Sequence, residues 1–368
     1  MNEFIKQSVG IDISKLSFSA CICQQDITGE QKLSKVSEFN NTKSGFNQFI
    51  KWQRKLLLST SEVICVMEAT GVYYENLAYH LTNLKMNVAV ILPNKVAHFA
   101  KSLNIKTKTD AVDARVIAKL GVERKLTLWK PPHPIFKTLK ELTRQYSDLK
   151  KERTVFINRS KAIESGYDPQ RLIIKSNKAV IKELTKQIEI CEIEIGKLIR
   201  SEEWLWSKVN KILTIKGVGL ITASIILAET QGFEFVQNIK QLTSYAGLDV
   251  VKRESGTSIQ GKTKISKKGN GRIRSALYFP ALISSLHNED LAKTYHRIIE
   301  NKPSKMIGIT ALQRKILILI YTLWKKNEAY IENYPKGQVT KAGRVISSLP
   351  AQDSLQLVQL ETSFVSEI

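Results

Sequence analysis

The sequence predicts an α/β domain at the N-terminus, a long helical arm after it, and a mainly helical C-terminal domain. Three observations lead to this order. Up to residue 125, short apolar runs of strand type alternate with helical patterns. Between residues 139 and 198, apolar side chains recur in steps of three and four. From residue 204 the pattern is again apolar and helical, with glycines and prolines interrupting it.

The composition indicates the partner more than the fold. The chain has 368 residues, enough for two or three domains. Its 56 Lys and Arg against 34 Asp and Glu give a formal net charge of +22. Such an excess suits a polyanion, either nucleic acid or an acidic membrane surface.

Targeting and redox signals favour the cytoplasm. No run reaches the roughly 18 uncharged apolar residues of a membrane span, and the first residues contain no signal-peptide core. The four cysteines lie in apolar patterns without zinc-type spacing, which predicts reduced, buried thiols. The five histidines are scattered and form no metal-binding pair. We therefore expect a cytoplasmic protein with no membrane partner and no histidine-based zinc site.

The N-terminal elements follow from their apolar periods. An apolar strand carries the single charge of Asp12, and a nearly continuous apolar run ends at Glu68, as in a strand covered on both faces. Thr42 or Ser44 is expected to cap the first helix. The expected strands are residues 7–14, 16–22, 35–39, 62–68 and 87–92, and the expected helices begin near residues 42–44, 73 and 110.

Four carboxylates stand out in this domain. Asp110 and Asp113 are three residues apart, which puts them on one face of a helix. Asp12 is costly in an apolar strand unless it is paired or binds a metal. The alternatives are a cap and a helix-dipole contact for the helical pair, a salt bridge for Asp12, and a turn role for Glu68. Together the four could hold two Mg²⁺ ions for phosphoryl transfer, and this order of elements and acids resembles the RNase H/RuvC-like nuclease fold.

A proline-rich linker at residues 131–134 indicates a domain boundary. The two long helices after it are separated by a break at residues 166–169. They predict an antiparallel helical hairpin or a dimerising coiled coil, with a helical spacer inside one chain as the alternative.

Residues 213–219, followed by an apolar helix, resemble a helix-hairpin-helix. Glycines at a helix N-terminus expose amides that can hold a DNA phosphate, although a plain tight turn is also possible. The candidate contacts here are Lys216, Gly217 and Gly219.

A basic, glycine-containing stretch follows. Between residues 251 and 280 there are eight Lys or Arg and one acidic residue, Glu254. Such a patch suits a phosphate backbone, with ordinary surface charge as the alternative for the two arginines. The candidate nucleic-acid contacts are Lys262, Lys264, Lys267, Lys268, Arg272 and Arg274.

The same stretch contains a match to the phosphate-binding loop of ATPases at residues 256–263. That motif also requires a buried strand before it and an apolar helix directly after it. Polar and basic residues flank it here, so we expect a loop or hairpin and no ATP binding.

Several short motifs occur together in this chain. They are GID at Asp12, MEATGVYY at Glu68, KTDAVDAR at Asp110 and Asp113, IKGVG at Gly217, SYAGL at Gly247, and ESGTS followed by KKGNGRIRSALY. In this combination, from about residue 9 to 324, the chain resembles transposases of the insertion-sequence one-ten family, which are DEDD recombinases related to Piv-type DNA invertases. It departs from that pattern at Asp249 and Val250, where relatives often carry a proline.

The resemblance implies an enzyme of bacterial or archaeal cells, associated with the nucleoid. Its metal ligands would be the acidic tetrad and its nucleophile Ser255, with Ser244 and Ser258 as rivals. Its partners would be double-stranded DNA and a structured bridge RNA. It would work as a homodimer or homotetramer with a composite active site.

The expected domains are a RuvC-like catalytic domain at residues 1–130, a coiled-coil arm at 131–203, a transposase domain at 204–333 and a flexible tail at 334–368.

Three other functions remain open. A RuvC-like nuclease or resolvase would use water in place of Ser255. A Piv-type invertase would work without RNA. A nucleic-acid-binding protein without catalysis would explain the charge of +22 but not the placed carboxylates.

Overall fold

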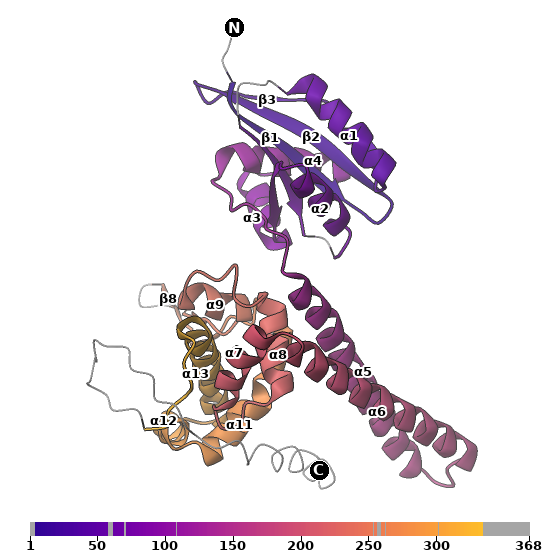
Figure 1. Ribbon diagram of the computed structural model, residues 1–368, viewed down its shortest axis with the longest axis vertical. Helices are drawn as coiled ribbons and strands as arrows, with labels where there is room; N and C mark the ends of the chain where they lie inside the picture. The colour runs from indigo at the N-terminus through magenta and orange to yellow at the C-terminus, as the bar shows by residue number, and fades with distance from the viewer. Residues whose placement is uncertain are drawn as a thin grey trace. The chain divides into compact units, whose positions relative to one another are not determined.

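The computed structural model describes residues 4–57, 62–69, 71–107, 109–252, 254–255, 259–261, 263–300 and 302–333 (Figure 1). The chain divides into two units, Met1–Thr138 and Leu139–Ile368. Each unit is described by itself below.

A mixed six-stranded sheet forms the centre of the first unit. Its main path runs β3 (Gln31–Leu33), β2 (Ser17–Asp26), β1 (Phe4–Ile13), β5 (Val63–Glu68) and β6 (Asn87–Ile91), while β4 (Ser37–Asn40) also pairs with β2. The β1–β2 hairpin is antiparallel, and β1, β5 and β6 run parallel. The predicted α/β class of this region is confirmed.

Helices cover both faces of this sheet, and consecutive residues of β5 show which helix covers which face. Met67 packs with Phe49 of α1 (Lys43–Leu56) and Leu77 of α2 (Glu75–Asn83). Val66 points to the other face and packs with residues of α3 (Pro93–Ser102) and α4 (Asp110–Glu123). Because side chains alternate along a strand, the two clusters lie on opposite sides of the sheet.

Some details differ from the sequence prediction. The sequence pattern predicts no helix at α3, because it indicates Pro93 only as the end of a strand. Proline also suits the first turn of a helix, where its missing N–H costs nothing. The short strand β3 was not expected either. The first predicted helix is capped by Thr42, whose hydroxyl accepts a hydrogen bond from the Gly45 amide.

Two long helices open the remainder of the chain. They are α5 (Pro134–Glu164) and α6 (Arg171–Arg200), separated by the break at residues 165–170. Lys178 Nζ lies 3.3 Å from Glu164 Oε1, which ties the two helices beside their turn. The predicted helical hairpin is therefore present.

A helical bundle completes the second unit. Its helices are α7 (Glu203–Leu213), α8 (Leu220–Thr230), α9 (Ile239–Ala246), α10 (Gly271–Ala276), α11 (Tyr278–His287), α12 (Glu289–Ile299) and α13 (Lys305–Lys326). By length and hydropathy α13 is the one described helix that qualifies as a membrane span. It packs against α7, α9, α11 and α12 and buries Leu312, Ile316 and Ile320, as a core helix does.

Between α9 and α10 the backbone forms two short antiparallel ladders. The outer strands β7 (Val250–Val251) and β10 (Lys264–Ile265) pair, and β8 (Glu254–Ser255) pairs with β9 (Ile259–Gln260). Within the stretch that matches the ATPase loop, Ile259 and Gln260 form β9, and β10 follows the stretch where that motif requires a helix.

Candidate active site

Two of the four carboxylates sit on neighbouring parallel strands. The β1–β5 ladder pairs Ile11 with Met67, so Asp12 and Glu68 follow at the same level. Ile11 and Met67 belong to the core on the α1 side, so Asp12 and Glu68 lie on the α4 side of the sheet. Both are half-buried.

Glycines let α4 lie directly on β1. A Cβ at Gly10 would overlap backbone atoms of Ala114 and Ala118. A Cβ on Gly121 would overlap the side chain of Ser8, which is fully buried. Because higher numbers on the helix match lower numbers on the strand, α4 runs antiparallel to β1. Its N-terminus therefore reaches the end of β1 that carries Asp12.

The other two carboxylates occupy the first turn of α4. The N-cap is Thr109, whose Oγ1 accepts a hydrogen bond from Val112 N at 3.3 Å. Asp110 is thus the first helical residue and not the cap that the alternative interpretation gave it. Asp110 is exposed and Asp113 half-buried. Both lie at the positive end of the helix dipole, which stabilises carboxylates there.

These elements bring all four acids to one cavity of about 250 Å³. Three serines share it and were not singled out from the sequence. Ser19 lies opposite Asp12 in the β1–β2 register, so the pairing of the hairpin was the signal that would have found it. The cavity is lined by Asp12, Ile13, Ser14, Ser17, Phe18, Ser19, Glu68, Asp110 and Asp113.

The donor set suits a hard cation, although the coordination shell is not formed. Four carboxylates offer oxygen ligands, which Mg²⁺ prefers over nitrogen and sulfur. Among the described residues, no group of three or more His, Cys, Asp and Glu is arranged to hold a metal ion. The like charges of four carboxylates repel one another, and a cation among them would lower that repulsion.

Ser255 belongs to the second unit, on the hairpin between α9 and α10. Its backbone pairs with Ile259 across the β8–β9 ladder. At the base of the hairpin, Ser266 N donates to Asp249 O at 2.9 Å, and the Ser266 hydroxyl donates to the Asp249 carboxylate. Asp249, where the sequence departs from the family pattern, thus closes the hairpin. The rival Ser244 is exposed on α9, and Ser258 lies outside the described residues.

At the position of the predicted helix-hairpin-helix, α7 is followed by a tight turn and α8. Gly217 has φ +93°, and a Cβ there would press on Pro280 and Ser284 of α11. The Ser284 hydroxyl donates to Lys216 O at 2.7 Å, so α11 covers this side of the turn. Gly219 is the N-cap of α8.

The Lys216 side chain is already paired within the protein. Its Nζ lies 2.7 Å from Glu332 Oε2. The hydrogen bond and charge of Glu332 raise the pKa of Lys216, and Lys216 lowers the pKa of Glu332. A phosphate would have to compete with this carboxylate.

The basic candidates near the hairpin fall into two groups. Lys264, Lys267 and Lys268 are exposed, whereas Lys262 lies outside the described residues. Both arginines make contacts within the protein. The Arg272 guanidinium donates to both oxygens of Asp148, each at 3.2 Å, and Arg274 Nη1 donates to Ala246 O at 2.7 Å, where α9 ends.

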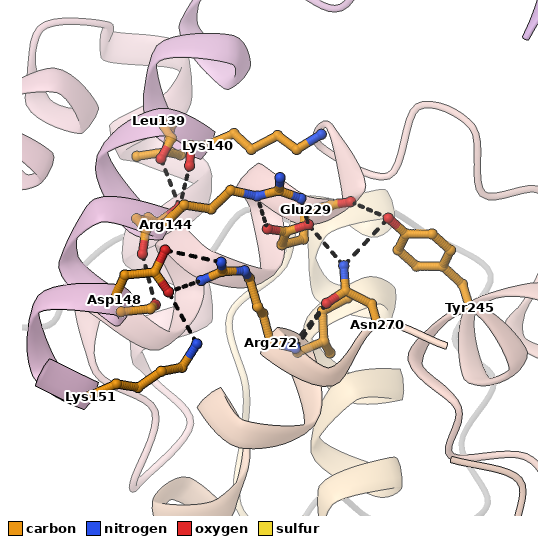
Figure 2. Close-up of polar contacts among 12 residues, drawn as sticks. Leu139, Lys140, Arg144, Asp148, Lys151, Glu229, Tyr245, Asn270 and Arg272 are labelled. Carbon is orange, nitrogen blue, oxygen red and sulfur yellow. Dashed lines mark hydrogen bonds and ion pairs between the residues drawn. The ribbon is translucent and has the colours of Figure 1, made fainter. Parts of the chain in front are cut away.

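A buried carboxylate that the sequence analysis did not single out joins this region to α5 (Figure 2). Glu229 of α8 is 2% exposed and accepts two hydrogen bonds from Arg144. Asn270 Nδ2 donates to the same carboxylate at 2.8 Å, and the Tyr245 hydroxyl donates to Glu229 O at 2.9 Å. A lone Glu in the apolar run of α8 was the signal that would have found it.

Burial alone would raise the pKa of Glu229. The hydrogen bonds and charge of Arg144, with the Asn270 amide, outweigh that effect and lower its pKa below the usual value. Asn270 also caps α10, since its Oδ1 accepts from Arg272 N and Ile273 N. The buried carboxylate thus fixes the segment between the Ser255 hairpin and α10.

Two family models match the chain. One, described as "Transposase" and built on DEDD transposases of the IS110 type, matches residues 9–169. The other, described as "Transposase IS116/IS110/IS902 family", matches residues 209–297.

Relatives cover most of the same region. The "Pilin gene-inverting protein" of Moraxella bovis is 29% identical over 330 residues, 88% of this chain and 98% of that protein. An "Insertion element IS110 uncharacterized 43.6 kDa protein" of Streptomyces coelicolor is 22% identical over 60% of this chain and 51% of its own length. A Ppx/GppA family structure from Aquifex aeolicus covers 88% of this chain and 92% of its own at 10% identity, with a TM-score of 0.20.

Proposed function

This chain belongs to the IS116/IS110/IS902 family of transposases, and from that membership we propose that it cuts and rejoins DNA through a covalent phosphoserine at Ser255. The observation that carries the proposal is the gathering of Asp12, Glu68, Asp110 and Asp113 in one cavity. Three separate elements, β1, β5 and α4, contribute them. A merely structural role for each acid would not require that convergence.

The same four carboxylates would hold Mg²⁺, and we propose two ions. Bound there, Mg²⁺ would supply positive charge to the attacking and leaving oxygens of a phosphodiester. The RNase H/RuvC-like architecture proposed for this unit is supported by the mixed sheet with both covered faces and by the acids at the ends of β1 and β5. The protein's own part is to position the acids, through the close packing of α4 on Gly10.

The proposed reaction at Ser255 makes one bond to phosphorus for each one that it breaks, and it needs no external energy source. The serine oxygen forms a bond to phosphorus, the bond from phosphorus to a deoxyribose oxygen breaks, and the serine proton is lost while the leaving oxygen gains one. Rejoining reverses the exchange with a new DNA end. Because the phosphodiester energy is kept in the serine ester, ATP is not needed. A serine hydroxyl is a weak nucleophile unless a base or metal activates it, so the acidic tetrad and Ser255 must act in one reaction.

Guidance by a bridge RNA and assembly into a dimer or tetramer are part of the proposal. The net charge of +22 and the exposed lysines beside the hairpin support binding of nucleic acid. The position of Ser255 in a different unit from the acids supports a site that needs both units, supplied by one chain or by two. Mixing Asp110→Asn protein with Ser255→Ala protein tests this, since activity of the mixture would require two chains to share a site.

The deciding experiment is a search for DNA-linked peptide in cells that carry the element and its flanking DNA. After nuclease trimming and proteolysis, mass spectrometry should find a nucleotide adduct on the peptide that contains Ser255. The adduct should be absent in Asp110→Asn and in Ser255→Ala, and present in Ser244→Ala, an exposed serine on α9. Junctions formed by Ser255→Ala without an adduct would instead favour a RuvC-like nuclease that uses water.

One observation favours a second candidate. The Moraxella bovis relative, which matches 88% of this chain, is named for inverting a pilin gene. A protein-only DNA invertase would use the same acids and serine on inverted sites. Recombination by purified protein after ribonuclease treatment would favour the invertase, and loss of recombination would favour RNA guidance.

A further inference from the structure

A second cavity of the first unit, of about 330 Å³, lies along α4. Among the described residues, its charged lining residues are Lys106, Arg115 and Lys119, and all three are cations. The floor is apolar, with Val116 only 1% exposed. The cavity is lined by Leu33, Ile105, Lys106, Thr107, Val112, Arg115, Val116 and Lys119.

The three cations converge on this cavity without carboxylate partners. Within the described residues, no hydrogen bond or ion pair engages the side chains of Lys106, Arg115 or Lys119. Lysine and arginine side chains that share a cavity repel one another, and an apolar floor strengthens that repulsion because it excludes water. An anion bound there would relieve it.

The cavity is on the same helix as the catalytic acids. Arg115 and Lys119 follow Asp113 by two and six residues, so they lie about 3 and 9 Å farther along the axis at 1.5 Å per residue. At 100° per residue they face a different side of α4, toward β3 and the segment before the helix. A nucleic-acid strand advances about 3.4 Å per nucleotide along a duplex, so these offsets span roughly one to three nucleotides.

The charges of Arg115 and Lys119 also act on two cysteines of β2. Burial raises the pKa of Cys21, and the positive charge of Arg115 is among the effects that oppose the rise. Burial likewise raises the pKa of Cys23 to about 12, against the charge of Lys119. The cavity itself brings Arg115 and Lys119 together with Leu33 of β3.

We propose that Lys106, Arg115 and Lys119 form a phosphate-binding pocket for the DNA strand being cut, at nucleotides next to the phosphodiester in the acidic cavity. This rests on the proposed function, because it takes DNA to be the substrate of the acids. DNA is favoured over RNA because one rigid helix carries both sites. Asp110, Asp113, Arg115 and Lys119 all belong to α4, so the two cavities keep a fixed spacing along one helix. The pocket positions DNA and takes no part in the chemistry.

The test measures equilibrium binding by the full chain in the presence of EDTA, with labelled duplex DNA and, separately, labelled structured RNA. The variant K106Q/R115Q/K119Q removes three charges and leaves a polar, uncharged side chain at each position. The matched control K51Q/R54Q/K55Q removes two lysines and one arginine from the exposed face of α1. Affinity is measured over a range of salt concentrations, since each phosphate contact contributes about 0.9 to the slope of log affinity against log salt.

The expected result is a salt slope for DNA that is smaller by about 2 to 3 in the pocket variant, with a change below about 1 in the control. Arg115→Lys should keep most of the DNA affinity, and thermal unfolding should show that every variant is folded. Equal changes of the DNA salt slope in the two triple variants would overturn the proposal. A loss of affinity for RNA without a loss for DNA would overturn it too. Because EDTA prevents catalysis, the result is independent of Ser255, so the phosphoserine proposal can fail while the pocket stands.

Discussion

Arg144 Nε lies 2.8 Å from Glu229 Oε1, and Arg144 Nη2 lies 3.0 Å from Glu229 Oε2, which makes a two-pronged ion pair between α5 and α8. The Glu229 side chain is 1% exposed and that of Arg144 is 43% exposed. A charge so deeply buried is stable only with its partner, because its hydration is lost.

Arg144→Ala should therefore destabilise the second unit. Removing one partner of a fully buried pair costs about 3–5 kcal/mol, and the partial exposure of Arg144 puts the expected loss near the lower end, about 3 kcal/mol. Urea unfolding followed by tryptophan fluorescence measures it. Lys151→Ala, which breaks an exposed pair with Asp148 on the same helix, should cost less than about 1 kcal/mol. Equal losses in the two variants would contradict the assigned role.

The same pair predicts a dependence of stability on pH. The pKa of Glu229 is lowered in the folded protein from its ordinary 4.5. A lowered carboxyl pKa adds stability above the unfolded pKa, and that stability is lost as pH falls through the folded pKa. The unfolding midpoint of the wild type should thus drop below pH 4.5, and Glu229→Gln should have a smaller drop. A drop of the same size in Glu229→Gln would assign the acid sensitivity to other carboxyls.

Gly10→Ala should separate the acids. Its Cβ would overlap the backbone of α4 at Ala114 and Ala118, so the helix must move away from β1. Overpacking of this kind costs about 1–3 kcal/mol. We expect recombination to fall sharply, because Asp110 and Asp113 move with the helix. Gly166→Ala, in the exposed turn after α5, should leave recombination and the thermal unfolding midpoint close to the wild type.

Mg²⁺ should stabilise the first unit without any DNA. Binding to the native state alone adds about 2.7 kcal/mol when the free ion is at a hundred times its dissociation constant. Thermal unfolding with Mg²⁺ or with EDTA should give a higher midpoint with the ion. The shift should vanish in a variant with both Asp12→Asn and Asp113→Asn, and a shift that persists there would place the ion elsewhere.

Local patterns were enough for much of this fold. The alternation after residue 16, the apolar run that ends at Glu68 and the steps of three and four in α6 each concern one element, so the sequence alone predicts them. The helix α3 was missed because a proline both ends a strand and begins a helix. The resemblance of the motifs to the family predicts the four acids and Ser255 as site residues, without any contact.

The sequence by itself determined which residue types are present and on which kind of element each one lies. Only the tertiary structure decided that Asp12, Glu68, Asp110 and Asp113 share a cavity, that Gly10 makes room for α4, and that Arg272 and Arg274 are bound to Asp148 and to Ala246 O. The physical reason is the distance along the chain between the residues that interact. Periodicity reflects how one helix or strand meets its surroundings, whereas the pairing of distant residues depends on how whole elements pack.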